Sequence, residues 1–293
     1  MESVEFIITG GMIMTTGGNT IDLFHLDAFT DRPFTGNPAA VCPLDQVLPA
    51  SLMRKIAAEV NLSETAFVLP IDGDHANATR FRIRWFTPLV EVLLCGHATL
   101  ASAAVILNEI GNPAEKIFFE SKSGSLTACR SANGFTLDFP SNPPHPCPIP
   151  PGILEGLGLA EGKTGWISKE AEMLLIPLGT YEEVRSLSPD YRKLLAVSGR
   201  NGAQGVIVTA PGPEIFDFCS RYFGPWEGIN EDPVTGSAHT VLAPYWGSQL
   251  GKSFFRALQA SERTGIVEAR LVAGQRVELT GKVRLVMRGS LFI

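Results

Sequence analysis

The sequence predicts an α+β protein built from two copies of one unit, with antiparallel sheets curled around buried helices. Three observations lead to this prediction. Strand-like segments are many and short, whereas helical segments are few. The helical segments that follow two glycine turns are apolar or small on most sides, so each must be covered over most of its surface. A set of landmarks in the first half of the chain also recurs in the same order in the second half.

The first half alternates strand patterns with two helix patterns. Apolar residues alternate with three arginines in "TRFRIRWF", as in a strand with one buried face. Leu52, Ile56 and Val60 recur at helical spacing, which predicts a helix with one buried stripe. The strands expected in this half are 21–29, 65–70, 79–86, 116–121, 125–130 and 134–139, and the helices are 51–60 and 98–107.

A proline-rich segment, Pro140 to Gly152, separates these elements from the rest and predicts a connector, because it holds seven prolines. Beyond it we expect helical stretches at 151–158 and 180–196, strands at 172–177 and 205–210, and mostly strands to the end. Three parts are therefore expected. They are an N-terminal extension of residues 1–20, a first domain of 21–125 and a second domain of 126–282.

Composition excludes several classes of function. The chain has 24 Lys and Arg against 30 Asp and Glu, and the basic residues are scattered, so a nucleic-acid partner is not expected. The five cysteines are odd in number and show no C-x-x-C spacing, which predicts reduced thiols in a cytoplasmic protein without a metal site. Glu2 and Glu5 do not suit a signal peptide, and the lack of a long apolar run predicts no membrane partner. A small-molecule partner fits best.

The repeat is the most informative feature of the sequence. "RWFTP" in the first half has a counterpart in "RYFGP", and "ETAFVLP" has one in "GVIVTAP". Gly96 follows the first Pro by eight residues and Gly236 follows the second by eleven, and each glycine opens an apolar helix. Two related domains would aim these helix starts at one shared cleft. Because the first N–H groups of a helix have no internal partner, each start is a potential carboxylate or phosphate site, unless it is only a helix cap.

Two acidic residues stand out near these turns. Glu64 lies where a helix gives way to an apolar strand, and we expect burial to raise its pKa toward the range useful for proton transfer. Its repeat counterpart is Gly205, so the site has one base rather than two. Asp232, fixed in extended backbone by Pro233, is placed to reach into the cleft, whereas Glu231 is expected to be a helix-dipole partner.

The remaining candidates are a thiol and three histidines. The counterpart of Cys95 is Thr235, a poor proton acceptor, which favours a packing role for Cys95 over half of a two-base racemase. His97 is placed to donate to a substrate or relay a proton, or it is only a polar residue at a helix start. His239 is expected to be structural, and His25 either lines the cleft or packs.

Six motifs together resemble the PhzF-like family of phenazine-biosynthesis proteins, which has a diaminopimelate-epimerase-like fold. They are "DAFTDRPFTGNPAAV", "NLSETAFV", "RWFTP", "CGHATLASA", "SRYFGPW" and "EDPVTGSAH". The resemblance implies two similar domains, each a mostly antiparallel, barrel-like sheet around a central helix, with the active site in the cleft between them. It also implies that the last strand, within 283–293, returns to the first domain and that the protein is a homodimer.

The same resemblance implies roles for individual residues. Glu64 corresponds to the acid/base, and His97 and Asp232 correspond to the other catalytic residues. Gly236 and Ser237 correspond to the backbone that binds the substrate carboxylate. The chain departs from the family pattern in keeping a thiol in its C-G-H-A-T turn and in reading "SERTG" near its end.

The resulting hypothesis is a cofactor-independent isomerase that moves a proton within a small carboxylate-bearing substrate, such as a cyclic amino or hydroxy acid. The turn residues Cys95, Gly96, Thr235, Gly236 and Ser237 are expected to bind that substrate. An epimerase or racemase that uses Cys95 with Glu64, and a non-catalytic binding protein, remain as alternatives.

Overall fold

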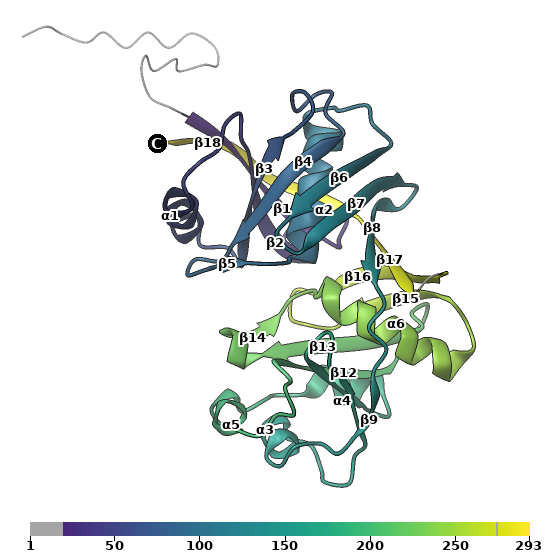
Figure 1. The fold of residues 1–293 in the computed structure, drawn as a ribbon. Coiled ribbons are helices and arrows are strands. Elements are labelled where there is room, and N and C mark those ends of the chain that lie inside the picture. The colour runs from purple at the N-terminus through teal and green to yellow at the C-terminus, as the bar shows by residue number, and fades with distance from the viewer. Residues whose placement is uncertain (1–19, 274) are drawn as a thin grey trace, which may run out of the picture.

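The computed structural model describes residues 20–273 and 275–293. The N-terminal extension expected at residues 1–20 therefore lies outside the described residues, apart from Thr20, which begins the first strand. Two sheets dominate the structure, and each one wraps around a helix (Figure 1). The expected α+β class with few helices is confirmed.

The first sheet surrounds α2 (Gly96–Ala104), of which every residue from His97 to Ala104 is buried. Its strands are ordered β18, β1, β2, β3, β4, β6, β7, β8, with the short β5 paired beside β4. Their bounds are β1 (Thr20–Ala28), β2 (Asn37–Pro43), β3 (Glu64–Pro70), β4 (Arg80–Phe86), β5 (Glu91–Val92), β6 (Lys116–Ser121), β7 (Gly124–Ser131), β8 (Gly134–Pro140) and β18 (Val283–Phe292).

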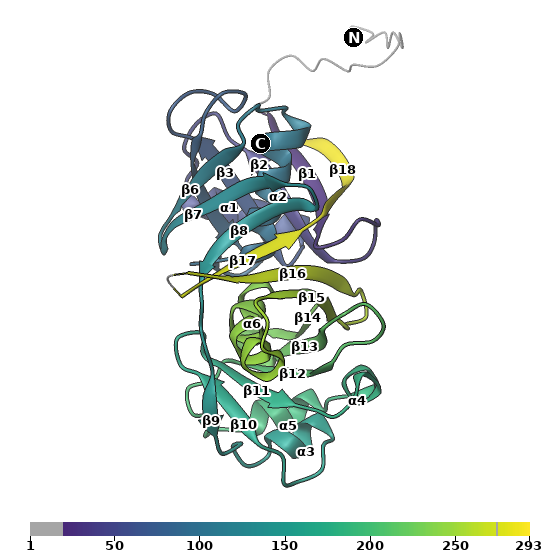
Figure 2. The same cartoon turned by 90° about the vertical axis from the view of Figure 1, so that its right-hand side faces the viewer.

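The second sheet surrounds α6 (Gly236–Leu250) in the same way (Figure 2). Its order is β9, β10, β11, β12, β13, β15, β16, β17, with β14 paired beside β13. The bounds are β9 (His145–Cys147), β10 (Gly165–Ser168), β11 (Met173–Pro177), β12 (Gly205–Pro211), β13 (Phe218–Gly224), β14 (Ile229–Asp232), β15 (Phe254–Gln259), β16 (Gly265–Val272) and β17 (Arg276–Gly281).

The two halves have the same topology, which bears out the repeat in the sequence. β2 runs parallel to β3 as β11 does to β12, and β4 runs parallel to β6 as β13 does to β15. When the chain is divided into β1–β9 and β10–β18, the last strand of each part pairs with the first strand of the other part, β9 with β10 and β18 with β1. An antiparallel ladder between β8 and β17 joins the two sheets.

Strand pairing groups residues 20–140 and 283–292 around α2, and residues 145–281 around α6. The domain boundary expected at residue 125 falls inside β7. We propose a division after β8 instead, because β7 and β8 continue the first sheet.

The remaining helices lie outside the sheets. α1 (Ala50–Val60) covers the outer face of the first sheet, where Met53 and Ile56 pack with Phe67 and Phe86. On the second half lie α3 (Ile153–Leu157), α4 (Tyr181–Ser186) and α5 (Tyr191–Ala196), with a π-turn at Val105–Glu109 after α2 and a 3-10 turn, η2, at Pro225–Glu227.

Two sequence expectations need correction. The single helical stretch expected at 180–196 is two helices, because Pro189 disfavours helix in the residue before it and Asp190 caps a new start at α5. The connector at Pro140–Gly152 also contributes β9 to the second sheet, since its backbone pairs with β10. Proline-rich chain is extended and therefore suits a short edge strand.

Candidate functional site

The starts of the two central helices meet at the junction of the two halves. A Cβ atom built on Gly96 would lie 3.6 Å from the Cα of Gly236, and the converse distance is also 3.6 Å. The N-cap residues Cys95 and Thr235 are both extended, and neither side chain caps its helix. The two helix starts therefore lie against each other, and their first-turn N–H groups have no N-cap side-chain acceptor, as in an anion site. The expectation that the two turns lie together is confirmed.

Glu64 reaches this junction because of strand alternation. Ala66 and Val68 belong to the core around α2, whereas Phe67 belongs to the core beneath α1. Glu64 has the same parity as Ala66 and Val68, so its side chain points inward, toward the start of α2. It is 9% exposed, and its Oε2 atom lies 3.1 Å from Nε2 of His97. This ion-pair contact is not aligned as a hydrogen bond, and Oε2 accepts no other well-aligned hydrogen bond from the described residues.

The expectation that burial leaves Glu64 with a raised pKa is wrong. Burial alone raises the pKa of Glu64. The positive charge of His97 and the polar groups of His97, Ser63 and Cys95 lower it by more, so the pKa lies below its usual value. Burial lowers the pKa of His97, but Cys95 and Glu64 raise it well above its usual value. The two residues therefore form a buried carboxylate–imidazolium pair.

Asn37 connects this pair to the second half of the chain. The residue is completely buried at the start of β2, and its Nδ2 atom donates to Oδ1 of Asp232 at 2.8 Å and to the carbonyl of Val234 at 2.9 Å. The same amide nitrogen lies 3.1 Å from Nδ1 of His97. Asn37 was not a sequence candidate, although it stands in the "TGNP" of a motif noted above. The sequence feature that could have identified Asn37 is a polar residue at the start of a strand, held in extended backbone by the following Pro38.

Asp232 is buried at the end of β14, as its position before Pro233 predicts. Its carboxylate accepts from Asn37 and from the hydroxyl of Thr235. Gln259, a second residue missed from the sequence, donates to the Asp232 carbonyl at 2.8 Å and accepts the Thr235 N–H at 2.8 Å. Burial raises the pKa of Asp232, and Glu64 raises it further, while His97 and the two hydrogen bonds lower it.

Cys95 lies in the same cluster. Its Sγ atom is 3.6 Å from Nδ1 and 3.8 Å from Nε2 of His97. Burial and the Glu64 charge raise the pKa of the thiol, which therefore stays protonated at neutral pH. Donor atoms of Glu64, Cys95 and His97 all lie within 4.8 Å of one another, close enough to ligate one metal ion.

The "SERTG" segment braces the loops around the site. Ser261 donates to the carbonyl of Pro233 at 2.7 Å. Arg263 crosses to the first half, where it donates to Oδ1 of Asp27 at 2.7 Å and to the carbonyl of Gly36 at 2.8 Å. This segment thus fixes the loop that precedes Asn37.

Other sequence candidates have structural roles. Glu231 does not serve as a helix-dipole partner, because Arg221 binds it through two hydrogen bonds of 2.7 and 2.8 Å. The repeat-related pair Arg84 and Glu91 makes the same two-bond contact. His239 is buried and its Nδ1 donates to the Thr235 carbonyl at 2.9 Å, and burial lowers its pKa to about 4.

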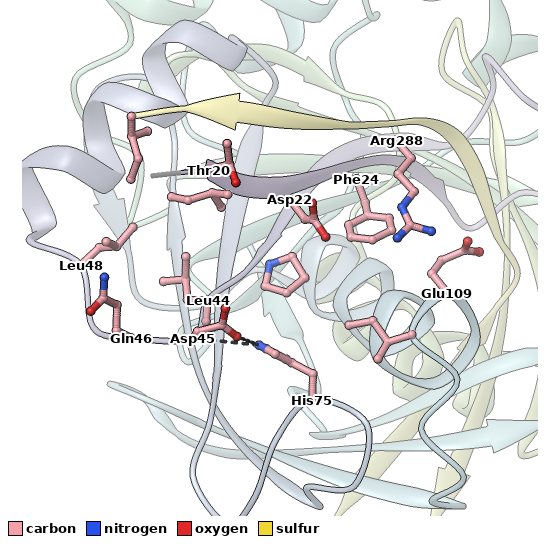
Figure 3. A pocket seen from close by; sticks show the side chains of 14 residues that line it. Thr20, Asp22, Phe24, Leu44, Asp45, Gln46, Leu48, His75, Glu109 and Arg288 are labelled. Carbon is pink, nitrogen blue, oxygen red and sulfur yellow. Dashed lines mark hydrogen bonds and ion pairs between the residues drawn. The ribbon is translucent and has the colours of Figure 1, made fainter. Parts of the chain in front are cut away.

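A cavity of about 650 Å³ lies elsewhere, beside β1 and the loop after β2 (Figure 3). Its lining includes Asp22, Asp45, His75, Glu109 and Arg288, and none of the residues of the Glu64 cluster. This cavity is therefore separate from the junction of the helix starts. Within the described residues no helix combines the length and apolarity needed to cross a membrane.

Comparisons with known proteins agree with this architecture. A family model described as phenazine biosynthesis-like protein matches residues 26–289. An uncharacterized isomerase of Pseudomonas aeruginosa is 45% identical over 273 residues, which cover 93% of this chain and 99% of that protein. The human phenazine biosynthesis-like domain-containing protein is 41% identical over 284 residues, covering 92% and 99%. The crystal structure of a PhzF-family protein of Enterococcus faecalis has a TM-score of 0.86 at 38% identity, covering 94% of this chain and 100% of that one.

Proposed function

Because this chain belongs to the phenazine biosynthesis-like family, we propose that it is an isomerase that moves a proton within a small carboxylate-bearing substrate without a cofactor. One observation carries the proposal. The buried carboxylate of Glu64, whose Oε2 atom is paired with His97 and accepts no well-aligned hydrogen bond from the described residues, lies beside two helix starts that neither N-cap side chain closes. A base and an anion-binding surface are the two parts that such a reaction needs.

The substrate carboxylate binds at the turns of Gly96 and Gly236. Backbone N–H groups of both helices donate to its oxygens, and the helix dipoles favour its negative charge. Negative charge that develops on the substrate when a C–H proton leaves can delocalise into this carboxylate. The same N–H groups then stabilise the transition state more than the ground state.

Glu64 performs the proton transfer. It is ionised at neutral pH because His97 holds its pKa below the usual value, so it can accept a proton from a carbon of the substrate. The protonated Glu64 then returns that proton to another carbon of the same substrate, and no net proton or electron is exchanged. His97 holds the carboxylate in place, and Asp232 accepts a hydrogen bond from an amine or hydroxyl of the substrate.

The spacing of the cluster argues against an epimerase that uses Cys95 with Glu64. Two groups that act on opposite faces of one carbon must each be within about 3 Å of it, so they stand about 6 Å apart. The donor atoms of Glu64 and Cys95 lie within 4.8 Å of each other and share His97 as a neighbour. Glu64 and Cys95 are therefore closer together than two groups on opposite faces of one carbon would be.

Solvent-deuterium exchange tests the proposal. The protein is incubated in D2O with a panel of cyclic amino and hydroxy carboxylates that includes dihydro-hydroxyanthranilate, and C–D formation is followed by NMR. We expect Glu64→Gln to slow exchange by about a hundredfold to ten-thousandfold while substrate still binds. Glu59→Gln, an exposed glutamate on α1, is the matched control and should stay within about twofold. Equal exchange by Glu64→Gln would remove the assignment, and binding without any exchange by the unmodified protein would indicate a non-catalytic binding role.

A further inference from the structure

Gln259 is a completely buried amide whose partners are Asp232 and Thr235, just before α6. It is the last residue of β15, and its Oε1 atom accepts the N–H of Thr235 at 2.8 Å. Its Nε2 atom donates to the carbonyl of Asp232 at 2.8 Å and to the hydroxyl oxygen of Thr235 at 3.2 Å. A backbone N–H can only donate and a carbonyl can only accept, so these two groups fix which end of the amide is oxygen.

The amide also fixes the direction of the hydrogen bond between Thr235 and Asp232. Nε2 of Gln259 carries two hydrogens, and the Asp232 carbonyl and the Thr235 hydroxyl oxygen take one each. Since the Thr235 hydroxyl accepts from Gln259, its own hydrogen points to its other neighbour, Oδ2 of Asp232. The hydroxyl is therefore a donor to Asp232 rather than an acceptor from it.

Both oxygens of Asp232 accept hydrogen bonds as a result. Oδ2 accepts from Thr235, and Oδ1 accepts from Nδ2 of Asn37 at 2.8 Å. The orientation of the Asn37 amide is fixed in the same way, because Nδ2 also lies 2.9 Å from the carbonyl oxygen of Val234. Donors on both oxygens favour a carboxylate over a protonated acid.

The charged groups around Asp232 oppose one another. Burial raises the pKa of Asp232, the charge of His97 on α2 and the two hydrogen bonds lower it, and the charge of Glu64 on β3 raises it. Two more titratable groups, Tyr222 on β13 and Glu227 in η2, also interact with this carboxylate. Because burial and Glu64 both work against its charge, Asp232 depends on its donors to stay ionised.

Gln259 differs from its counterpart in the first half of the chain. That counterpart is Ser121, which ends β6 as Gln259 ends β15. Ser121 donates to the carbonyl of Gly124 at 2.8 Å, within its own hairpin. The amide is thus a feature of the half that supplies Asp232.

We propose that Gln259 is a positioning residue that acts through the Thr235 hydroxyl to keep Asp232 an ionised hydrogen-bond acceptor for the substrate. This inference rests on the proposed function, in which Asp232 accepts a hydrogen bond from the substrate. Without Gln259, the Thr235 hydroxyl is free to accept, and a protonated Asp232 can then donate to it. This bond stabilises the neutral acid, which is a weaker acceptor than the carboxylate.

A double-mutant cycle read by the titration of Asp232 tests the inference. Gln259→Met removes the amide without adding a charge, and Thr235→Val removes the hydroxyl at nearly constant shape. The pH dependence of the Asp232 carboxyl 13C shift is followed by NMR on the folded protein and assigned with Asp232→Asn. We expect Thr235→Val to raise the titration midpoint by about one pH unit, because one donor to the carboxylate is lost. Gln259→Met should raise it by less, and the double variant should match Thr235→Val, because Gln259 acts through the hydroxyl.

Gln249→Met, at an exposed glutamine near the end of α6, is the control and should leave the midpoint unchanged. An unchanged midpoint in Gln259→Met would overturn the inference. Shifts that add in the double variant would do the same, because Gln259 would then act on Asp232 by another route. If Gln259→Met does not fold, an unchanged midpoint in Thr235→Val overturns the inference equally, because the hydroxyl is the only route proposed. Deuterium exchange tests the proposed function separately: an unmodified chain that exchanges none would remove that function, whereas the Asp232 midpoints would still decide how Gln259 acts.

Discussion

A methyl group placed between the two helix starts should close the proposed carboxylate site without unfolding the protein. Gly96→Ala is the simplest such change. The added Cβ would lie 3.6 Å from the Cα of Gly236 and 3.8 Å from Cζ of Phe139, which are ordinary van der Waals contacts. The backbone of Gly96 is not in the left-handed region, so alanine fits its conformation without strain.

Gly96→Ala should have opposite effects on stability and on carboxylate binding. Alanine restricts the unfolded chain more than glycine does, so the free energy of unfolding should stay constant or rise by about 0.5 to 1 kcal/mol. The methyl group should keep the substrate carboxylate from the N–H groups of both turns. A hydrogen bond to a charged group contributes about 1.5 to 3 kcal/mol, so losing one weakens binding by about tenfold to more than a hundredfold.

Urea denaturation and titration with cyclohexanecarboxylate measure the two effects separately. Gly199→Ala is the neutral control, because a Cβ there meets nothing within 4 Å. Gly205→Ala is the opposite control, because its Cβ would overlap the Tyr222 hydroxyl and should destabilise the fold by about 1 to 3 kcal/mol. Unchanged carboxylate affinity in Gly96→Ala would refute the reasoning, as would a loss of stability like that of Gly205→Ala.

Three further predictions concern the groups around the site. Cys95→Ser should keep deuterium exchange within about threefold of the unmodified chain, because the raised pKa of Cys95 leaves it a protonated thiol; a hundredfold loss would give the thiol a part in the chemistry. The exchange rate needs ionised Glu64 and protonated His97. The pKa of Glu64 is lowered from 4.5 and that of His97 is raised well above 6.5, so the exchange rate should be flat between pH 4.5 and pH 6.5. The rate should fall only at lower pH, where Glu64 is protonated, and at higher pH, where His97 loses its proton. A midpoint between pH 4.5 and pH 6.5 would contradict the ion pair. Arg263→Gln should lower the free energy of unfolding by about 1 to 3 kcal/mol, because it leaves the buried carboxylate of Asp27 without its cation, although the partly exposed guanidinium limits the loss. A change below about 0.5 kcal/mol in urea denaturation would show that this contact does not brace the two halves.

The sequence predicts the parts of the site that depend on local order. The repeat placed Gly96 and Gly236 in equivalent turns, and because both halves share one topology the turns meet in the structure. Strand alternation was enough to turn Glu64 inward. These features follow from residue spacing along the chain, which the fold preserves.

The parts of the site that the sequence does not predict depend on contacts between distant segments of the chain. The pKa of Glu64 falls because His97, on another element, lies 3.1 Å away, and no pattern near Glu64 reveals that distance. Asn37 and Gln259 join segments about two hundred and about thirty residues away, so each looks like an ordinary polar residue in the sequence. Tyr222 fills the space above Gly205 only because β13 lies beside β12.

A crystal structure of the protein grown with saturating cyclohexanecarboxylate tests the central claim most directly. We expect the carboxylate oxygens to lie within hydrogen-bond distance of backbone N–H groups at both the Gly96 and the Gly236 turns, with the ring against the Glu64 carboxylate. A ligand bound elsewhere, with both turns empty, would contradict the claim that the paired helix starts hold the substrate beside its base.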